Sequence, residues 1–225
     1  MTGKRGPLLW TVAAVWLLAP TALAALRWPR WWSWIASEET PMTWLQSVVL
    51  VLASASSLMV VYVLRRATTA SALPWWLLAL GFSALAIDER FALHERVRDG
   101  VLAPRGIRVP FLPWVAPGDF LVMGIGVAGL AVLPMVWRAM SPEPLARRAL
   151  LVGVLLAVVA VGTDSIDPST WSVSAERLQQ SLEEVVELGS GLALLTSVLC
   201  RLLGLLDGHL QPALQTASPD PVRSG

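Results

Sequence analysis

Six long apolar runs constrain the fold of this chain more than any other feature. They cover Leu8–Leu26, Trp44–Leu64, Pro74–Leu93, Phe120–Trp137, Ala149–Asp164 and Leu188–Leu206. An α-helix rises about 1.5 Å per residue, so roughly 20 apolar residues cross the hydrocarbon core of a bilayer. Since a helix satisfies its own backbone hydrogen bonds in lipid, the runs predict an all-α integral membrane bundle of six transmembrane helices.

The composition supports a membrane protein and excludes several other classes. Only 15% of the residues are charged and 55% are hydrophobic, whereas a soluble domain carries about 25% charged residues. The net charge of +1 gives no basic field for nucleic acid, so we expect the lipid bilayer as the partner and leave protein partners open. The single cysteine, Cys200, excludes a disulfide within the chain and a cysteine-based metal knuckle.

The distribution of Lys and Arg predicts the orientation. Basic residues such as Arg65, Arg66, Arg147 and Arg148 fall at the ends of the bundle that also hold the termini, so both termini are expected in the cytoplasm. The expected location is the cell membrane (plasma or inner), crossed several times.

A cleaved signal peptide is the alternative for the first run, although the length of that run, about 19 residues, exceeds the usual apolar core of 7–15.

One domain is expected over residues 1–208, followed by a disordered cytoplasmic tail over 209–225 that is rich in Pro and Ser. Two connecting segments are expected at the membrane surface. The segment Arg27–Ser37 holds four tryptophans and is typical of an interfacial segment. The proline-rich segment Val101–Gly118 is expected to pack on the membrane surface or over the bundle.

Acidic residues concentrate at one end of three predicted helices. The apolar parts of runs three and five, Pro74–Ile87 and Ala149–Gly162, cover only about 14 residues each, which is short of a full span. To span the membrane, these helices must carry their terminal acids into its outer part. Run six begins directly after Glu183-Glu184-Val185-Val186-Glu187, so all three groups of acids are predicted at the same, outer end.

Helical spacing groups these acids on common faces. Run three is expected to continue as one helix through Arg98, so Asp88 and Glu95 are nearly eclipsed and His94 lies on the same side. Glu183, Glu184 and Glu187 share an arc of about 100° on run six.

Carboxylates and one imidazole suit Zn, Mn or Fe. The candidate ligands are Asp88, His94, Asp164, Glu183 and Glu187. Glu95 or Glu184 is the candidate general base, and Arg98 is the candidate contact for an anionic headgroup.

Three interpretations of the cluster remain open. The first is a metal-dependent site acting on a lipid or another membrane-borne substrate; an enzyme of this kind would be a hydrolase or an oxidoreductase. The second is an ion-paired rim on an accessory or scaffold subunit that performs no chemistry. The third is a proton- or cation-coupled transporter, since acids inside membranes serve as relays. His94-Glu95 begins like an HExxH zinc motif, but Arg98 occupies the second His position.

Overall fold

The computed structural model describes residues 5–37, 39–67, 70–107, 109–110, 115, 120–164, 166 and 171–216. Over these residues the fold is all-α, which confirms the expected class. The α-helices are α1 (Gly6–Leu26), α2 (Pro41–Ala67), α3 (Leu73–Phe91), α4 (Leu93–Val97), α5 (Phe120–Ala139), α6 (Pro144–Asp164) and α7 (Val173–Thr216). Short helical turns cover Trp31–Trp34, Arg98–Leu102 and Ala103–Arg105.

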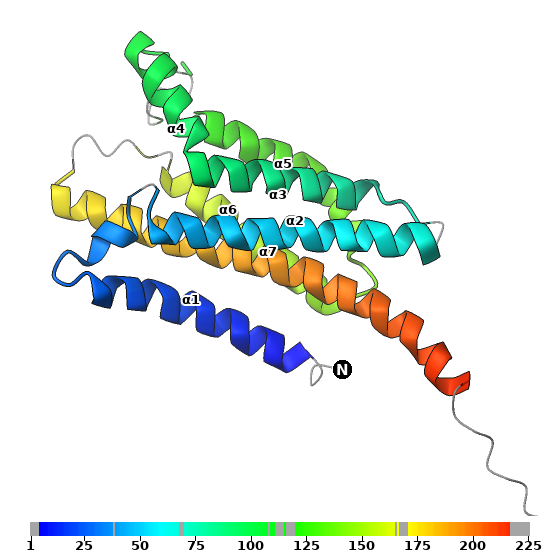
Figure 1. The fold of residues 1–225 in the computed structure, drawn as a ribbon. Helices are drawn as coiled ribbons and strands as arrows, with labels where there is room; N and C mark the ends of the chain where they lie inside the picture. Colours follow the sequence, from blue (N-terminus) through cyan, green and yellow to red (C-terminus); the bar gives the residue numbers. More distant parts are fainter. Residues whose placement is uncertain are drawn as a thin grey trace, which may run out of the picture.

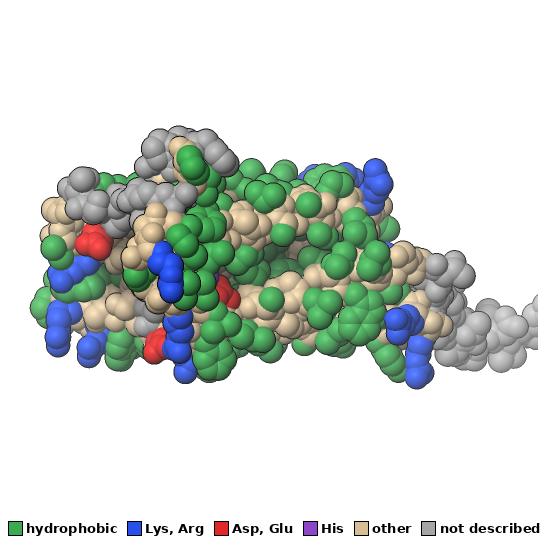
Figure 2. All heavy atoms as spheres, turned by 90° about the horizontal axis from the view of Figure 1, so that it is seen from above, with side chains coloured by type: hydrophobic (Ala, Val, Ile, Leu, Met, Phe, Trp, Pro, Cys, Tyr) green, Lys and Arg blue, Asp and Glu red, His purple; other side chains and the backbone are tan. Residues whose placement is uncertain are grey.

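Four helices in the described part of the chain are long and apolar enough to cross a membrane. They cover Gly6–Leu26, Pro41–Arg66, Pro144–Asp164 and Val173–Gly208. The apolar part of α5 is shorter, Met123–Ala139, and α3 carries Asp88, Glu89 and Arg90 in its last turn. Hydrophobic side chains cover the middle of the face in Figure 2, and Lys and Arg side chains lie toward its ends. A count of six spans, with α3 and α5 included, stays a proposal.

The long helices run alternately up and down, so their ends gather at two opposite ends of the bundle (Figure 1). The start of α1 and the end of α7 lie at one of these ends, where Arg5 pairs with Asp207 at 3.0 Å. The ends of α3 and α6 and the first part of α7 lie at the other end (Figure 1). The acids of these three helices are therefore at a common end, as the sequence predicts.

Helix α7 is the central element of the bundle, against which α6, α2 and α1 pack. The Ser190 hydroxyl donates to the Gly153 carbonyl of α6 at 3.0 Å, and both residues are buried. The Trp16 indole of α1 donates to the Val185 carbonyl at 2.8 Å, and it lies where a Cβ on Gly189 would stand. Small residues thus let the helix backbones approach closely, and buried hydrogen bonds fix α7 in register with its neighbours.

Three helix boundaries differ from the sequence prediction. Helix α3 ends at Phe91 because Ala92 adopts a left-handed conformation with φ 46°, so the predicted continuous helix through Arg98 is wrong. Helix α7 starts at Val173, well before the apolar run at Leu188, because its early residues are good helix formers such as Glu, Leu and Gln. It also continues to Thr216, so residues 209–216 are helical where a disordered tail is expected. Residues 217–225 lie outside the described part.

The proline-rich segment Val101–Gly118 is described only in part. Val115, which is 2% exposed, forms an isolated antiparallel bridge with Ile166, just beyond the end of α6. This contact brings the segment against the acidic end of the bundle at that point. The prolines Pro113 and Pro117 lie outside the described residues, so the expected packing of the segment over the bundle is not tested there.

Candidate metal centre

Three glutamates from two helices converge at the acidic end of the bundle. Glu89 comes from the last turn of α3, and Glu184 and Glu187 come from α7, where their i, i+3 spacing puts them on one face. One carboxylate oxygen from each residue lies within 4.8 Å of the other two. Glu184 is buried, and Glu89 and Glu187 are half-buried. We call these three residues the glutamate triad.

The geometry of the triad is compatible with a single bound cation. Oxygen ligands lie about 2.0–2.6 Å from Mg²⁺ or Ca²⁺, so two ligands on opposite sides of one ion are about 4–5 Å apart. The triad oxygens fall within that limit. Three carboxylates at this separation repel one another, and a divalent cation between them would offset that repulsion. The donor set therefore fits a metal ion.

Asp88 and His94 form a separate pair around the break at Ala92. One Asp88 oxygen accepts the His94 main-chain N–H at 2.8 Å, and the other lies 2.7 Å from the ring Nδ1. Since a carboxylate only accepts, Nδ1 carries the proton. Burial on its own lowers the pKa of His94, but the hydrogen bond and charge of Asp88 outweigh it, and the charges of Glu95 and Asp164 add to them. The pKa of His94 is therefore raised above its usual value.

Asp164 and Glu183 lie between α6 and α7, beside the triad. Gln179 of α7 donates to Glu183 Oε2 at 2.8 Å and to the Thr163 carbonyl at 3.2 Å, which ties the two helices together. The carboxyl groups of Asp164 and Glu183 are within hydrogen-bond reach of each other. Glu183 therefore faces α6, although it is next to Glu184 in the sequence.

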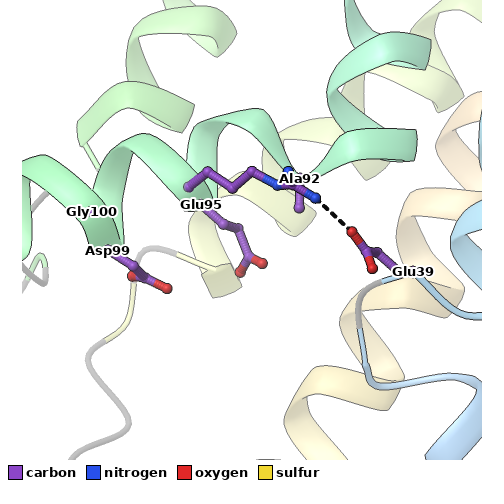
Figure 3. A pocket seen from close by; sticks show the side chains of 6 residues that line it. Glu39, Ala92, Glu95, Asp99 and Gly100 are labelled. Carbon is purple, nitrogen blue, oxygen red and sulfur yellow. Dashed lines mark hydrogen bonds and ion pairs between the residues drawn. The ribbon is translucent and has the colours of Figure 1, made fainter.

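Glu95 and Arg98 lie beside a surface groove, in a set of charged residues that we call the rim: Glu39, Glu95, Arg96, Arg98 and Asp99. The groove has a volume of about 560 Å³ and is lined by Glu39, Ala92, Glu95, Arg96, Asp99 and Gly100 (Figure 3). Arg96 pairs with Glu39 across it at 2.7 Å. Arg98 pairs with Glu95 at 2.9 Å and with Asp99 at 2.8 Å. The two residues predicted as a general base and a headgroup contact thus bind each other, and those two roles stay predictions.

The predicted ligands lie at the same end of the bundle, but those in the described residues do not all lie close enough to share one ion. Among the described residues, the group of acids close enough to share an ion includes Glu184 and Glu187 of the predicted set, but not Asp88, His94, Asp164 or Glu183. The break at Ala92 explains this for His94, because the chain folds back there and the His94 ring pairs with Asp88.

Glu89 is not among the candidate ligands predicted from the sequence. The face of run three predicted from helical spacing is centred on Asp88, and Glu89 points about 100° away from Asp88 around the helix axis. The available signal was the pair Asp88-Glu89 itself, because adjacent acids face different neighbours and one of them points toward α7.

The comparisons with known proteins identify a family without a known activity. Comparison with curated proteins and with solved structures gives no match. A family described as "Domain of unknown function (DUF8692)" matches residues 8–202, which include at least part of every described helix and all three glutamates of the triad. The chain therefore belongs to the DUF8692 family.

Proposed function

We propose that this chain is a helical membrane protein that binds a divalent cation through Glu89, Glu184 and Glu187 and uses it on a lipid or another membrane-borne substrate. The observation that carries the proposal is the convergence of three carboxylate oxygens, from two helices, within 4.8 Å. Acids inside a helical membrane bundle are costly and tend to mark functional sites.

The packing of the bundle supports a preformed site. Helices α3 and α7, which supply the ligands, both pack against α2. Buried hydrogen bonds join α2 to each of them: Ser54 donates to the Ala79 carbonyl of α3 at 2.9 Å, and Gln46 donates to the Glu184 carbonyl of α7 at 3.0 Å. Ligands on rigid elements hold their geometry before the ion arrives, so little ordering free energy is lost on binding.

The position of the triad, at the end of the bundle expected near the lipid headgroups, supports a membrane-borne substrate. The turn Trp31–Trp34 follows α1 at the acidic end, and the Arg177 guanidinium of α7 stacks over the Trp32 ring at 4.3 Å. Tryptophan and arginine together are typical of the headgroup region of a bilayer. A cation bound at this level would polarise a carbonyl or phosphoryl oxygen or activate a water molecule. A hydrolase or an oxidoreductase is the class of enzyme that we propose, with Glu95 as its general base.

Thermal unfolding in detergent tests the proposal. A ligand that binds only the folded state stabilises it by about 2.7 kcal/mol at 100 times its Kd. We expect Mn²⁺ to raise the Tm of the wild type and to have little effect on Glu187→Gln. Glu95→Gln is the matched control, because Glu95 lies in the rim and not in the triad, and it should respond as the wild type does. Equal Tm values with and without Mn²⁺ in the wild type would contradict the proposal.

A second candidate is an accessory or scaffold subunit whose acidic end is purely structural. The specific observation in its favour is the set of ion pairs Arg96–Glu39, Arg98–Glu95 and His94–Asp88. These pairs account for the rim without any chemistry. A purely structural acidic end predicts no effect of Mn²⁺ on the Tm, so that measurement separates the two candidates.

A further inference from the structure

Gln46 on α2 holds a buried polar atom that requires an explanation. The residue is 4% exposed. Its amide nitrogen, Nε2, donates to the main-chain carbonyl of Glu184 at 3.0 Å. Because a carbonyl oxygen only accepts, the nitrogen must face α7, which fixes the orientation of the amide. The amide oxygen, Oε1, is buried and has no hydrogen-bond partner among the described residues.

A buried amide oxygen without a hydrogen-bond partner lowers the stability of the folded protein. Leaving a buried acceptor unsatisfied costs about 1–3 kcal/mol, and buried polar atoms in native proteins nearly always have a partner. An apolar residue on this face of α2 would avoid the cost. The unsatisfied Oε1 therefore indicates a partner beyond the described residues, such as a water molecule or a cation.

The position of Gln46 indicates which partner. The Glu184 carbonyl that it contacts is on the turn of α7 that carries the side chains of Glu184 and Glu187. Glu89 reaches the same place from α3, which packs against α2. Three helices, α2, α3 and α7, thus bring polar groups to the neighbourhood of Glu184 at the acidic end of the bundle.

We infer that the Gln46 amide oxygen is a fourth ligand of the cation held by the glutamate triad, and that the centre is an all-oxygen site for a hard divalent cation such as Mn²⁺ or Mg²⁺. This inference rests on the proposed function. Carboxylate and amide oxygens are the donors that such ions prefer, whereas Zn²⁺ and Cu²⁺ sites commonly include imidazole or thiolate. The imidazole of His94 is held by Asp88 and is not a member of the triad group.

Mn²⁺ binding to the full chain in detergent, followed by electron paramagnetic resonance, tests this inference with two variants. Gln46→Met keeps the side-chain length and removes the oxygen, and we expect it to weaken Mn²⁺ binding at least tenfold. Gln46→Glu keeps an oxygen at the same position but loses the N–H donor to the Glu184 carbonyl, and we expect it to bind Mn²⁺ at least as tightly as the wild type does. Rescue by Glu but not by Met is the signature of a ligand.

The pulsed spectrum of bound Mn²⁺ supplies a second readout on the wild type alone, so the test does not depend on the folding of a variant. We expect no coupling to a directly coordinated ¹⁴N nucleus. Equal weakening in Gln46→Met and Gln46→Glu would show that Gln46 acts only through the Glu184 carbonyl and would overturn the inference, as would unchanged binding in Gln46→Met or a coordinated ¹⁴N. Absence of Mn²⁺ binding in the wild type would instead defeat the proposed function itself.

Discussion

Asp88 accepts two hydrogen bonds from His94, one from the main-chain N–H at 2.8 Å and one from the ring Nδ1 at 2.7 Å. The two residues stand on opposite sides of Ala92, which adopts the left-handed conformation that ends α3. The pair therefore stabilises a turn of the backbone that alanine rarely adopts. It also joins α4 and the rim to the end of α3, next to Glu89.

Replacing Asp88 should loosen this turn. We expect Asp88→Asn to lower the free energy of unfolding by about 1–2 kcal/mol, because hydrogen bonds to a charged group are stronger than neutral ones. The measurement is the unfolding midpoint in detergent. Glu39→Gln is the control, since its pair with Arg96 is exposed on both sides and such pairs contribute less than about 1 kcal/mol. A larger loss in Glu39→Gln than in Asp88→Asn would contradict the assignment.

The pH dependence of the pair follows from the raised pKa of His94. A group whose pKa is higher in the folded state than in the unfolded state adds stability that is fully present below the unfolded value, near 6.5 for histidine, and is lost as the pH rises through the folded value. We therefore expect the pairing to weaken as the pH rises through the folded pKa of His94, which lies above its usual value.

Nuclear magnetic resonance of the imidazole rings measures this pKa directly. The chain has two histidines, so His209→Gln leaves His94 as the single ring signal. The pKa read from that signal should be above the ordinary value, and it should fall when Asp88→Asn is added, because the largest favourable contribution comes from Asp88. A pKa that does not respond to Asp88→Asn would remove Asp88 as its cause.

Close packing of α6 on α7 gives a prediction about glycine. A Cβ on Gly153 would stand 2.7 Å from Leu194 Cγ and 3.1 Å from the Leu194 main-chain nitrogen. We expect Gly153→Ala to lower the free energy of unfolding by about 1–3 kcal/mol, the usual cost of overpacking. Gly162→Ala, on the same helix, has no atom within 4 Å of its added Cβ and should be neutral or slightly stabilising. Equal effects of the two substitutions would show that the helices separate without cost.

The class of fold and the location of the acids could be predicted from the sequence, because hydropathy and helix length are local properties. Runs three and five are short of a full span unless they include Asp88 and Asp164, and this places both residues at the same end of the bundle, as Figure 1 shows for the ends of α3 and α6. The start of α7 could not be predicted in this way. Its polar first turns, from Val173, are helical by propensity and not by hydropathy.

The composition of the site could not be predicted because it depends on the backbone torsion at Ala92 and on how α3 packs in the bundle. Ala92 is a good helix former, and its φ of 46° has no signal in the sequence, whereas a glycine or an asparagine there would have indicated a helix end. After this break, His94 folds back and pairs with Asp88. Glu89 lies before the break, and the packing of the bundle brings it to Glu184 and Glu187. Which acids face α7 is a property of tertiary packing.

The most direct test of the central claim is elemental analysis of the detergent-purified wild type beside Glu187→Gln. The account predicts a divalent metal in stoichiometric amount in the wild type after supply of Mn²⁺ and removal of excess ion, and its loss in Glu187→Gln with the fold intact by circular dichroism. No retained metal in the wild type, or equal metal in both proteins, would contradict a metal centre at Glu89, Glu184 and Glu187.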